Sequence, residues 1–372
     1  MKYYSQFFII FSFLFILFNG CSDDPAAVVD YDNIDLTDIE YSPENYTITY
    51  PQSSFPAPEI PEDNPMTRQG VDLGKFLFYD PVLSADSTMS CASCHLQIGS
   101  FTNNLPVSVG IDNIAGTRSA MSLLNVGFYN KGLFWDGRTT TLEELSLLPV
   151  TDEIEFHNEW PNVIGKFRAS DKYRSMFRKA FGIENSGEIT KELAAKAMSQ
   201  FQRTLNSSGE SKYDRVMAGK AVFTDQELMG FEIYFDVSED LPDGECFHCH
   251  NDPLMTTNQY LNNGLDEAED FSDFADLGHG KVTGIPFDNG RFRIPTLRNI
   301  VHSAPYMHDG RFQTLEEVLD HYNSGGKPSP NKDPLIQPLG LTQEHLDAVL
   351  VFLHTLTDET FMNNPEFADP TN

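Results

Sequence analysis

The sequence has few basic residues. Lys and Arg number 25 against 55 Asp and Glu in 372 residues, so the formal net charge at neutral pH is −30. Nucleic acids and anionic membrane surfaces favour basic patches, which argues against either as the main partner. A cationic protein partner is compatible with this charge, and so is a surface whose acidity only maintains solubility.

Apolar runs long enough to cross a membrane are also missing. The run from Phe7 to Phe18 has twelve residues, which is too short to span a bilayer but suits the core of a signal peptide. The segment Leu17-Phe18-Asn19-Gly20-Cys21 resembles a bacterial lipobox. We therefore predict a lipoprotein-type signal peptide over residues 1–20 and a periplasmic or cell-surface protein anchored through Cys21. The alternative is a plain signal peptide with an incidental cysteine.

Strand patterns with a period of two are absent, whereas helical patterns recur. Apolar residues follow a helical spacing in four stretches: Ile189, Leu193, Ala197, Phe201 and Leu205; Leu228, Phe231 and Phe235 behind the capping box Thr224-x-x-Glu227; Leu315, Val318, Leu319 and Tyr322; and Leu346, Val349, Leu350 and Leu353. The sequence thus predicts a mainly α fold with long loops.

The residues before this helical part are acidic and rich in proline, which favours an extended chain with little to bury. We predict a disordered tether over residues 21–65. Order should begin at Asn64-Pro65, a typical cap followed by proline at the first helical position.

Cysteine is scarce, but the positions of the cysteines follow a pattern. Apart from Cys21, all cysteines lie in Cys91-Ala92-Ser93-Cys94-His95 and Cys246-Phe247-His248-Cys249-His250. Both are C-x-x-C-H, the motif in which two thiols form thioethers with haem and the histidine ligates its iron. A zinc ribbon needs its pairs about 15–20 residues apart. A redox dithiol would not need a histidine after both cysteine pairs. Structural disulfides would give no reason for His95 and His250 to follow the two pairs.

The two motifs divide the chain into parts of domain size. We expect two tandem c-type cytochrome domains, an N-terminal one over residues 66–208 and a C-terminal one over 209–360, with a tail over 361–372. The expected cofactors are two covalently bound haem c groups, attached through Cys91 and Cys94 and through Cys246 and Cys249.

Longer stretches resemble the bacterial di-haem cytochrome c peroxidase/MauG family over nearly all of residues 66–358. Besides the two haem motifs, they are Leu73-Gly74-Lys75-Phe76-Leu77-Phe78-Tyr79-Asp80-Pro81, Leu133-Phe134-Trp135-Asp136-Gly137-Arg138, Arg293-Ile294-Pro295-Thr296-Leu297-Arg298-Asn299 and Ala304-Pro305-Tyr306-Met307-His308-Asp309-Gly310. The resemblance implies that the N-terminal haem reacts with peroxide and that the C-terminal haem passes electrons in.

The same resemblance assigns site residues. Glu155 matches the distal glutamate that moves a proton during peroxide cleavage, with Glu153 as its competitor or both as surface acids. Trp135 matches the tryptophan between the two haems; on its own it would be interpreted as a packed core residue. His95 and His250 are the expected iron ligands.

Two positions depart from the peroxidases. Ile111 stands where peroxidases that need reductive activation carry a histidine ligand, so we expect an open site that is active without pre-reduction, with His157 as a less favoured substitute ligand. Tyr322 stands at the axial methionine position, as in MauG, and is the expected axial ligand of the second iron; His321 and Met307 are the alternatives.

The family's calcium site would use Ser119, Ser303 and Pro305. Ser119 replaces an asparagine, which weakens the expectation of calcium.

The leading function is therefore reduction of hydrogen peroxide to water, with electrons from a small c-type cytochrome or a similar periplasmic donor. The first alternative is a MauG-like oxidase that modifies residues on a partner protein. The second is a di-haem electron carrier without catalysis. A homodimer is compatible with each.

Overall fold

The computed structural model describes residues 1, 30–51 and 54–371. Residues Tyr31–Asn372 form one compact unit. The predicted signal peptide and Cys21 lie outside the described residues. Within the described ranges, none of the helices has the length and apolar character that a membrane span requires.

The fold is mainly helical with little sheet. The helices are α1 (Arg68–Tyr79), α2 (Cys91–Cys94), α3 (Leu142–Thr151), α4 (Trp160–Ala169), α5 (Asp171–Phe181), α6 (Lys191–Gln202), α7 (Lys212–Met217), α8 (Asp225–Phe235), α9 (Gly280–Thr283), α10 (Leu315–Asn323), α11 (Gln343–His354) and α12 (Glu359–Met362). Two short strands, β1 (Tyr260–Leu261) and β2 (Phe292–Arg293), pair antiparallel, with Tyr260 opposite Arg293. This confirms the predicted mainly α fold class.

The four helices expected from apolar periodicity are α6, α8, α10 and α11. Each follows a threonine whose hydroxyl accepts a backbone N–H of the first turn: Thr190, Thr224, Thr314 and Thr342. Such caps satisfy one of the free N–H groups at a helix start and are worth about 1 kcal/mol each.

The start of the first helix was predicted wrongly. α1 begins at Arg68, because the Thr67 hydroxyl caps it by accepting from Gly70 N at 3.0 Å. Asn64, the expected cap, instead donates to a carboxylate oxygen of Glu143 at 2.6 Å. A long-range contact thus takes the side chain that local sequence would assign to the helix.

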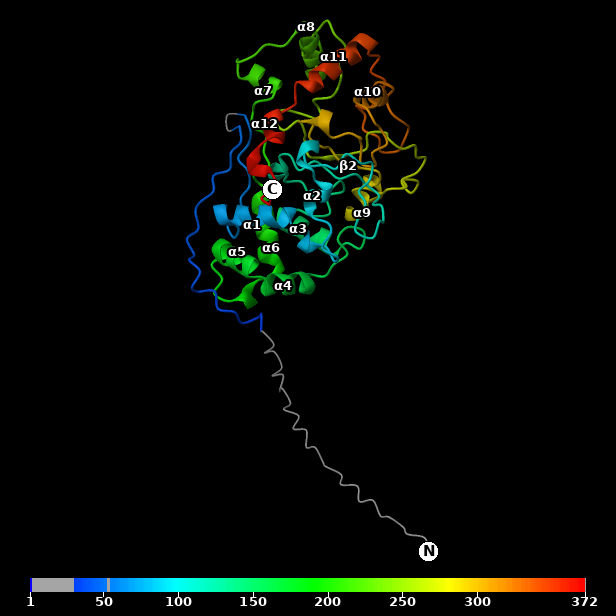
Figure 1. Ribbon diagram of the computed structural model, residues 1–372. Coiled ribbons are helices and arrows are strands. Elements are labelled where there is room, and N and C mark those ends of the chain that lie inside the picture. Colours follow the sequence, from blue (N-terminus) through cyan, green and yellow to red (C-terminus); the bar gives the residue numbers. More distant parts are fainter. Residues whose placement is uncertain (2–29, 52–53, 372) are drawn as a thin grey trace. The chain divides into compact units, whose positions relative to one another are not determined.

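One helix pair crosses in each half of the chain, and a glycine lies at each crossing. A Cβ on Gly74 of α1 would lie 1.8 Å from the carbonyl oxygen of Ala197 in α6. A Cβ on Gly230 of α8 would lie 2.0 Å from that of Ala348 in α11. Only glycine lets the two backbones approach so closely. Figure 1 shows two groups of helices in separate parts of the fold. One group contains α1, α3, α4, α5 and α6, and the other contains α8 and α11, which lie side by side.

The prediction of a disordered tether is wrong for residues 30–51 and 54–65, the part of it that the structure describes. Leu36, Ile48 and Phe55 are buried, and Leu36 and Ile48 belong to the core clusters around α1 and α6. Proline and acidic residues set the average composition, but a few apolar side chains are enough to hold the segment against the helices. The C-terminal tail is packed too: Phe361 and Phe367 lie in the cluster with Phe101.

The junction expected between the two domains is not a loose linker. Ser207 N donates to the side chain of Asn125 at 2.9 Å, and Ser208 N donates to Asp358 at 2.7 Å. The junction is therefore held from both halves of the chain, and the division at residue 208 stays a prediction.

Candidate functional site

The first C-x-x-C-H segment forms one wall of a large cavity. Cys91 and Cys94 are the ends of α2, a single helical turn, and the turn starts where Ser90 N donates to the Ser93 hydroxyl at 3.1 Å. Residues three apart on a helix share one face, so both thiols face the same side. Cys91, Cys94 and His95 line a cavity of about 1300 Å³.

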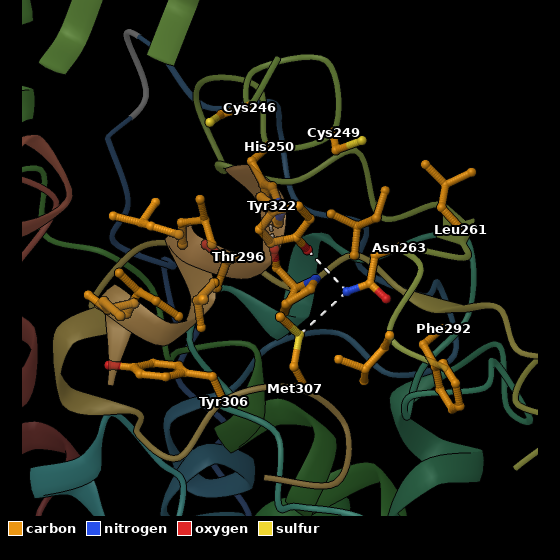
Figure 2. A pocket seen from close by; sticks show the side chains of 18 of the residues that line it. Cys246, Cys249, His250, Leu261, Asn263, Phe292, Thr296, Tyr306, Met307 and Tyr322 are labelled. Carbon is orange, nitrogen blue, oxygen red and sulfur yellow. Dashed lines mark hydrogen bonds between the residues drawn. The ribbon is translucent and has the colours of Figure 1, made fainter. Parts of the chain in front are cut away.

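The second C-x-x-C-H segment lines a smaller cavity of about 240 Å³. Cys246, Cys249 and His250 contribute to its wall, together with Tyr322 and Met307 (Figure 2). The four cysteines outside the undescribed N-terminal segment are free thiols. The two motifs, 155 residues apart in sequence, thus open onto separate cavities.

Both motif histidines are oriented by backbone carbonyls. Nδ1 of His95 lies 2.8 Å from the Phe101 oxygen, and Nδ1 of His250 lies 3.1 Å from the Pro295 oxygen and 3.3 Å from the Met255 oxygen. Burial lowers the pKa of both histidines, that of His250 to about 4. Each ring is therefore neutral, and because Nδ1 donates its proton, the lone pair of Nε2 is free to bind a metal.

The segment Arg293–Asn299 explains how His250 is held. Besides the Pro295 carbonyl, it supplies the Thr296 hydroxyl, which donates to Leu254 O at 2.6 Å. It also supplies Arg298, which donates to Pro253 O at 2.7 Å and forms a two-point ion pair with Asp214 at 2.9 and 3.0 Å. The side chain of Arg298 is 1% exposed, so this pair is shielded from solvent.

Tyr322, the expected axial ligand, lines the second cavity, and Met307 lines it as well. Asn263 Nδ2 donates to the Tyr322 oxygen at 3.1 Å and to the Met307 sulfur at 3.4 Å (Figure 2). Burial raises the pKa of Tyr322 to about 12, against the opposing effect of the Asn263 hydrogen bond. His321 is not among the lining residues; its Nε2 lies 3.0 Å from Asn263 O.

Glu155 lines the first cavity, whereas Glu153 is exposed and does not. Burial raises the pKa of Glu155 to about 7; the charge of Asp152 adds to this, and Arg138 opposes it. A carboxyl group with this pKa exchanges its proton near neutral pH, which is what a general acid–base requires.

Ile111 does not line the first cavity. Its backbone N donates to Glu155 O at 3.1 Å, and a Cβ on the preceding Gly110 would lie 1.5 Å from Ile154 O. The loop is thus pressed against the Glu155 segment through its backbone. His157 also lies outside the cavity. Its Nδ1 is 2.5 Å from an oxygen of Asp112, and its side chain is 56% exposed.

Trp135 lines both cavities. Its indole N–H donates to Ser119 O at 2.9 Å, and its carbonyl accepts from Arg293 N at 2.8 Å. The side chain is partly buried rather than enclosed in a hydrophobic core.

Ser119, Ser303 and Pro305, the positions that the resemblance assigns to calcium, all line the second cavity. The Ser119 hydroxyl donates to Met307 O at 3.1 Å.

Sequence analysis missed several residues around the cavities. Asn263 lies 59 positions from Tyr322 in an asparagine–glycine turn, and no periodicity or motif marks it. Arg118 bridges Asp136 and Asp276 at 2.7 Å each on the wall of the first cavity. Such contacts join distant segments, so no local pattern contains them.

These donor sets fit c-type haem. Each cavity receives two free thiols in the C-x-x-C spacing and one neutral histidine whose Nδ1 is held by a backbone carbonyl. The walls combine these groups with many apolar side chains. Thioether attachment and axial ligation need those three groups on one wall.

The comparison with known proteins also indicates a protein that carries c-type haem. A family model described as di-haem cytochrome c peroxidase matches residues 68–222. The chain is 31% identical over 317 residues to cytochrome c551 peroxidase of Nitrosomonas europaea, covering 85% of this chain and 86% of the relative. It is 30% identical over 347 residues to the methylamine utilization protein MauG of Methylorubrum extorquens, covering 91% and 90%.

One solved structure is similar to this chain in both sequence and fold. The crystal structure of a MauG-like protein associated with microbial copper homeostasis is 35% identical, with a TM-score of 0.76 over 86% of this chain and 97% of that one. The chain belongs to the bacterial di-haem cytochrome c peroxidase/MauG family, whose cofactor is haem c.

Proposed function

We propose that this protein is a di-haem c-type peroxidase that reduces hydrogen peroxide to water. Each peroxide takes up two electrons and two protons and yields two water molecules. Cys91, Cys94 and His95 would hold one haem and Cys246, Cys249 and His250 the other, in domains spanning residues 66–208 and 209–360. Haem iron in these places supplies the one-electron redox chemistry that the reaction needs.

The observation that carries this proposal is the position of Glu155. Its carboxyl group opens onto the same cavity as the first thiol pair and His95, and its pKa is about 7. As a carboxylate it accepts the proton of one peroxide oxygen, and as the acid it delivers that proton to the oxygen that leaves as water. The cavity, at about 1300 Å³, exceeds the roughly 300–1,000 Å³ of an ordinary ligand pocket.

Trp135 is the proposed relay for electrons because it lies on the walls of both cavities. Its N–H and its backbone are anchored to Ser119 and Arg293, so the ring is held in one position. Tyr322 is the proposed sixth ligand of the second iron. Its oxygen would bind as the phenolate, and the Asn263 hydrogen bond would stabilise that charge.

We propose a small basic cytochrome c as electron donor, because the net charge of −30 would steer a cation toward the surface. The Nitrosomonas relative carries a cytochrome in its name, cytochrome c551 peroxidase. Export to the periplasm or the cell surface through residues 1–20 and Cys21 completes the proposal.

A MauG-like oxidase acting on a partner protein is the second candidate, favoured by Tyr322 in the second cavity and by the relative in Methylorubrum. Two assays on the same holoprotein separate the two functions. Rapid peroxide-dependent oxidation of a reduced c-type cytochrome supports the peroxidase. Turnover confined to slow oxidation of a protein substrate would replace it by the oxidase. A resting protein without any high-spin ferric signal would be an electron carrier instead.

A further inference from the structure

Two carboxylates and one imidazole gather at the end of α8. Asp236 and His248 line neither cavity, and Glu245 lies at the edge of the cluster where it also lines the second cavity. One ligand atom from each of Asp236, Glu245 and His248 lies within 4.8 Å of the others. His248 Nε2 is 3.1 Å from an oxygen of Glu245 and 3.5 Å from Oδ2 of Asp236. Neither the peroxide chemistry nor haem attachment uses any of these side chains.

The backbone brings the three residues together. Asp236 is the C-terminal cap that follows α8, and its Oδ1 accepts from Gly244 N at 2.8 Å and from Glu245 N at 3.3 Å. A Cβ on Gly244 would lie 2.7 Å from the carbonyl oxygen of Ile233, so the chain passes tightly against the end of the helix. This contact fixes Asp236 beside the loop that carries the other two donors.

The second oxygen of Asp236 lacks a hydrogen-bond partner. Oδ2 is buried and accepts no hydrogen bond, and the side chain is only 11% exposed. Its sole ionic neighbour among the described residues is His248, at 3.5 Å. A buried carboxylate oxygen that accepts no hydrogen bond is costly, and a bound cation would remove that cost. Among the residues that the structure describes, His248 is the only basic side chain within ion-pair distance of Asp236 or Glu245.

We propose that Asp236, Glu245 and His248 bind a divalent first-row transition-metal ion such as Zn²⁺. One imidazole nitrogen and two carboxylate oxygens are a ligand set typical of such ions and leave a further position for water. Calcium and magnesium prefer sites built from oxygen alone. His248 is 41% exposed, so the ion has access from solvent.

Binding has a consequence that depends on the proposed function. His248 lies between Cys246 and Cys249, the attachment cysteines of the second haem. The ion would tie this attachment loop to the end of α8 and place positive charge near that haem. A nearby cation favours the reduced state, so the reduction potential of the second haem should become more positive.

The test is a calorimetric titration with Zn²⁺ of the holoprotein, which keeps its haem groups but has been treated with a chelator to remove other divalent metal ions. We expect one tight site, and an affinity at least about tenfold weaker in His248→Gln, which leaves the backbone contacts of Asp236 intact. Asp236→Asn should weaken binding similarly if its haem content is normal. Asp243→Asn, an exposed neighbour, and His157→Gln, at a distant exposed histidine–carboxylate pair, should bind as the unaltered protein does.

Unchanged Zn²⁺ affinity in His248→Gln would overturn the site, as would equal affinity for Mg²⁺ or Ca²⁺. A potential of the second haem that does not move on Zn²⁺ binding would overturn the coupling alone. Because binding is measured without turnover, a protein that binds Zn²⁺ but reduces no peroxide would refute the proposed function and leave the metal site standing.

Discussion

Asn263 donates a hydrogen bond to the phenol oxygen of Tyr322 at 3.1 Å, and the same amide nitrogen lies 3.4 Å from the sulfur of Met307. One side chain thus holds two donors of different chemistry on the wall of the cavity that also receives His250 (Figure 2). An oxygen donor favours a lower iron potential than a thioether. The choice between the two therefore decides what the second haem can do.

Tyr322→Phe should change the low-spin ferric signal of the second haem, because the ring remains and only the proposed ligand atom is lost. Electron paramagnetic resonance of the resting protein measures this. Met307→Leu is the matched control and should keep the original signal. The opposite pattern, with Tyr322→Phe silent and Met307→Leu altered, would assign the sixth position to Met307.

Glu155→Gln should lower peroxide turnover by about 10²- to 10⁴-fold while both haems stay attached, because an amide cannot take up and return the proton. Since the pKa of Glu155 is about 7, its basic form becomes populated as the pH rises through that value, and turnover of the unaltered protein should rise with it.

The check for this prediction is a pH profile of turnover for both proteins. Glu153→Gln is the control, because Glu153 is exposed and outside the cavity. If Glu153→Gln loses activity and Glu155→Gln retains it, the proton carrier has been assigned to the wrong residue.

Trp135→Phe should slow electron transfer between the two haems while peroxide still reacts once at the first, because phenylalanine is much harder to oxidise than indole. Rapid-mixing spectroscopy of the two-electron-reduced protein would follow the transfer. Trp160→Phe is a suitable control, since Trp160 lies in the core around α1 and α6 and lines neither cavity. Equal rates in all three proteins would leave Trp135 only a structural role.

The oxidised protein should reduce peroxide from the first turnover without prior reduction. The resemblance to the di-haem peroxidases puts Ile111 where a blocking histidine would stand, and an aliphatic side chain cannot ligate iron. His157 lies outside the cavity with its Nδ1 against Asp112. The measurement is a progress curve started with oxidised enzyme. A lag that disappears after pre-reduction would show that another group blocks the site.

Gly74→Ala should lower the free energy of unfolding by about 1–3 kcal/mol or more, because its Cβ would lie 1.8 Å from the Ala197 carbonyl oxygen. Gly165→Ala is the matched helix substitution: nothing lies within 4 Å of its Cβ, so it should stabilise the protein by about 0.5–1 kcal/mol. Thermal unfolding of both holoproteins compares them. Similar shifts in the two variants would contradict the close crossing of α1 and α6.

Several features could be predicted from the sequence because their determinants are local. The C-x-x-C-H spacing is confined to five residues, and α6, α8, α10 and α11 each combine a threonine cap with an apolar periodicity. The mainly α fold follows from those signals. Prediction failed where composition was averaged: residues 30–65 look like a tether, yet Leu36 and Ile48 enter the core.

Other features depend on contacts between distant segments, which no window of sequence contains. The Pro295 carbonyl orients His250 from 45 positions away, and Asn263 reaches Tyr322 from 59. Only folding places Glu155, and not Glu153, in the cavity, where loss of water raises its pKa. The sequence alone thus determined which chemical groups the protein carries, because covalent spacing is enough for that. The tertiary structure decided which of them share a cavity and how they are charged, because burial and approach are properties of the packed chain.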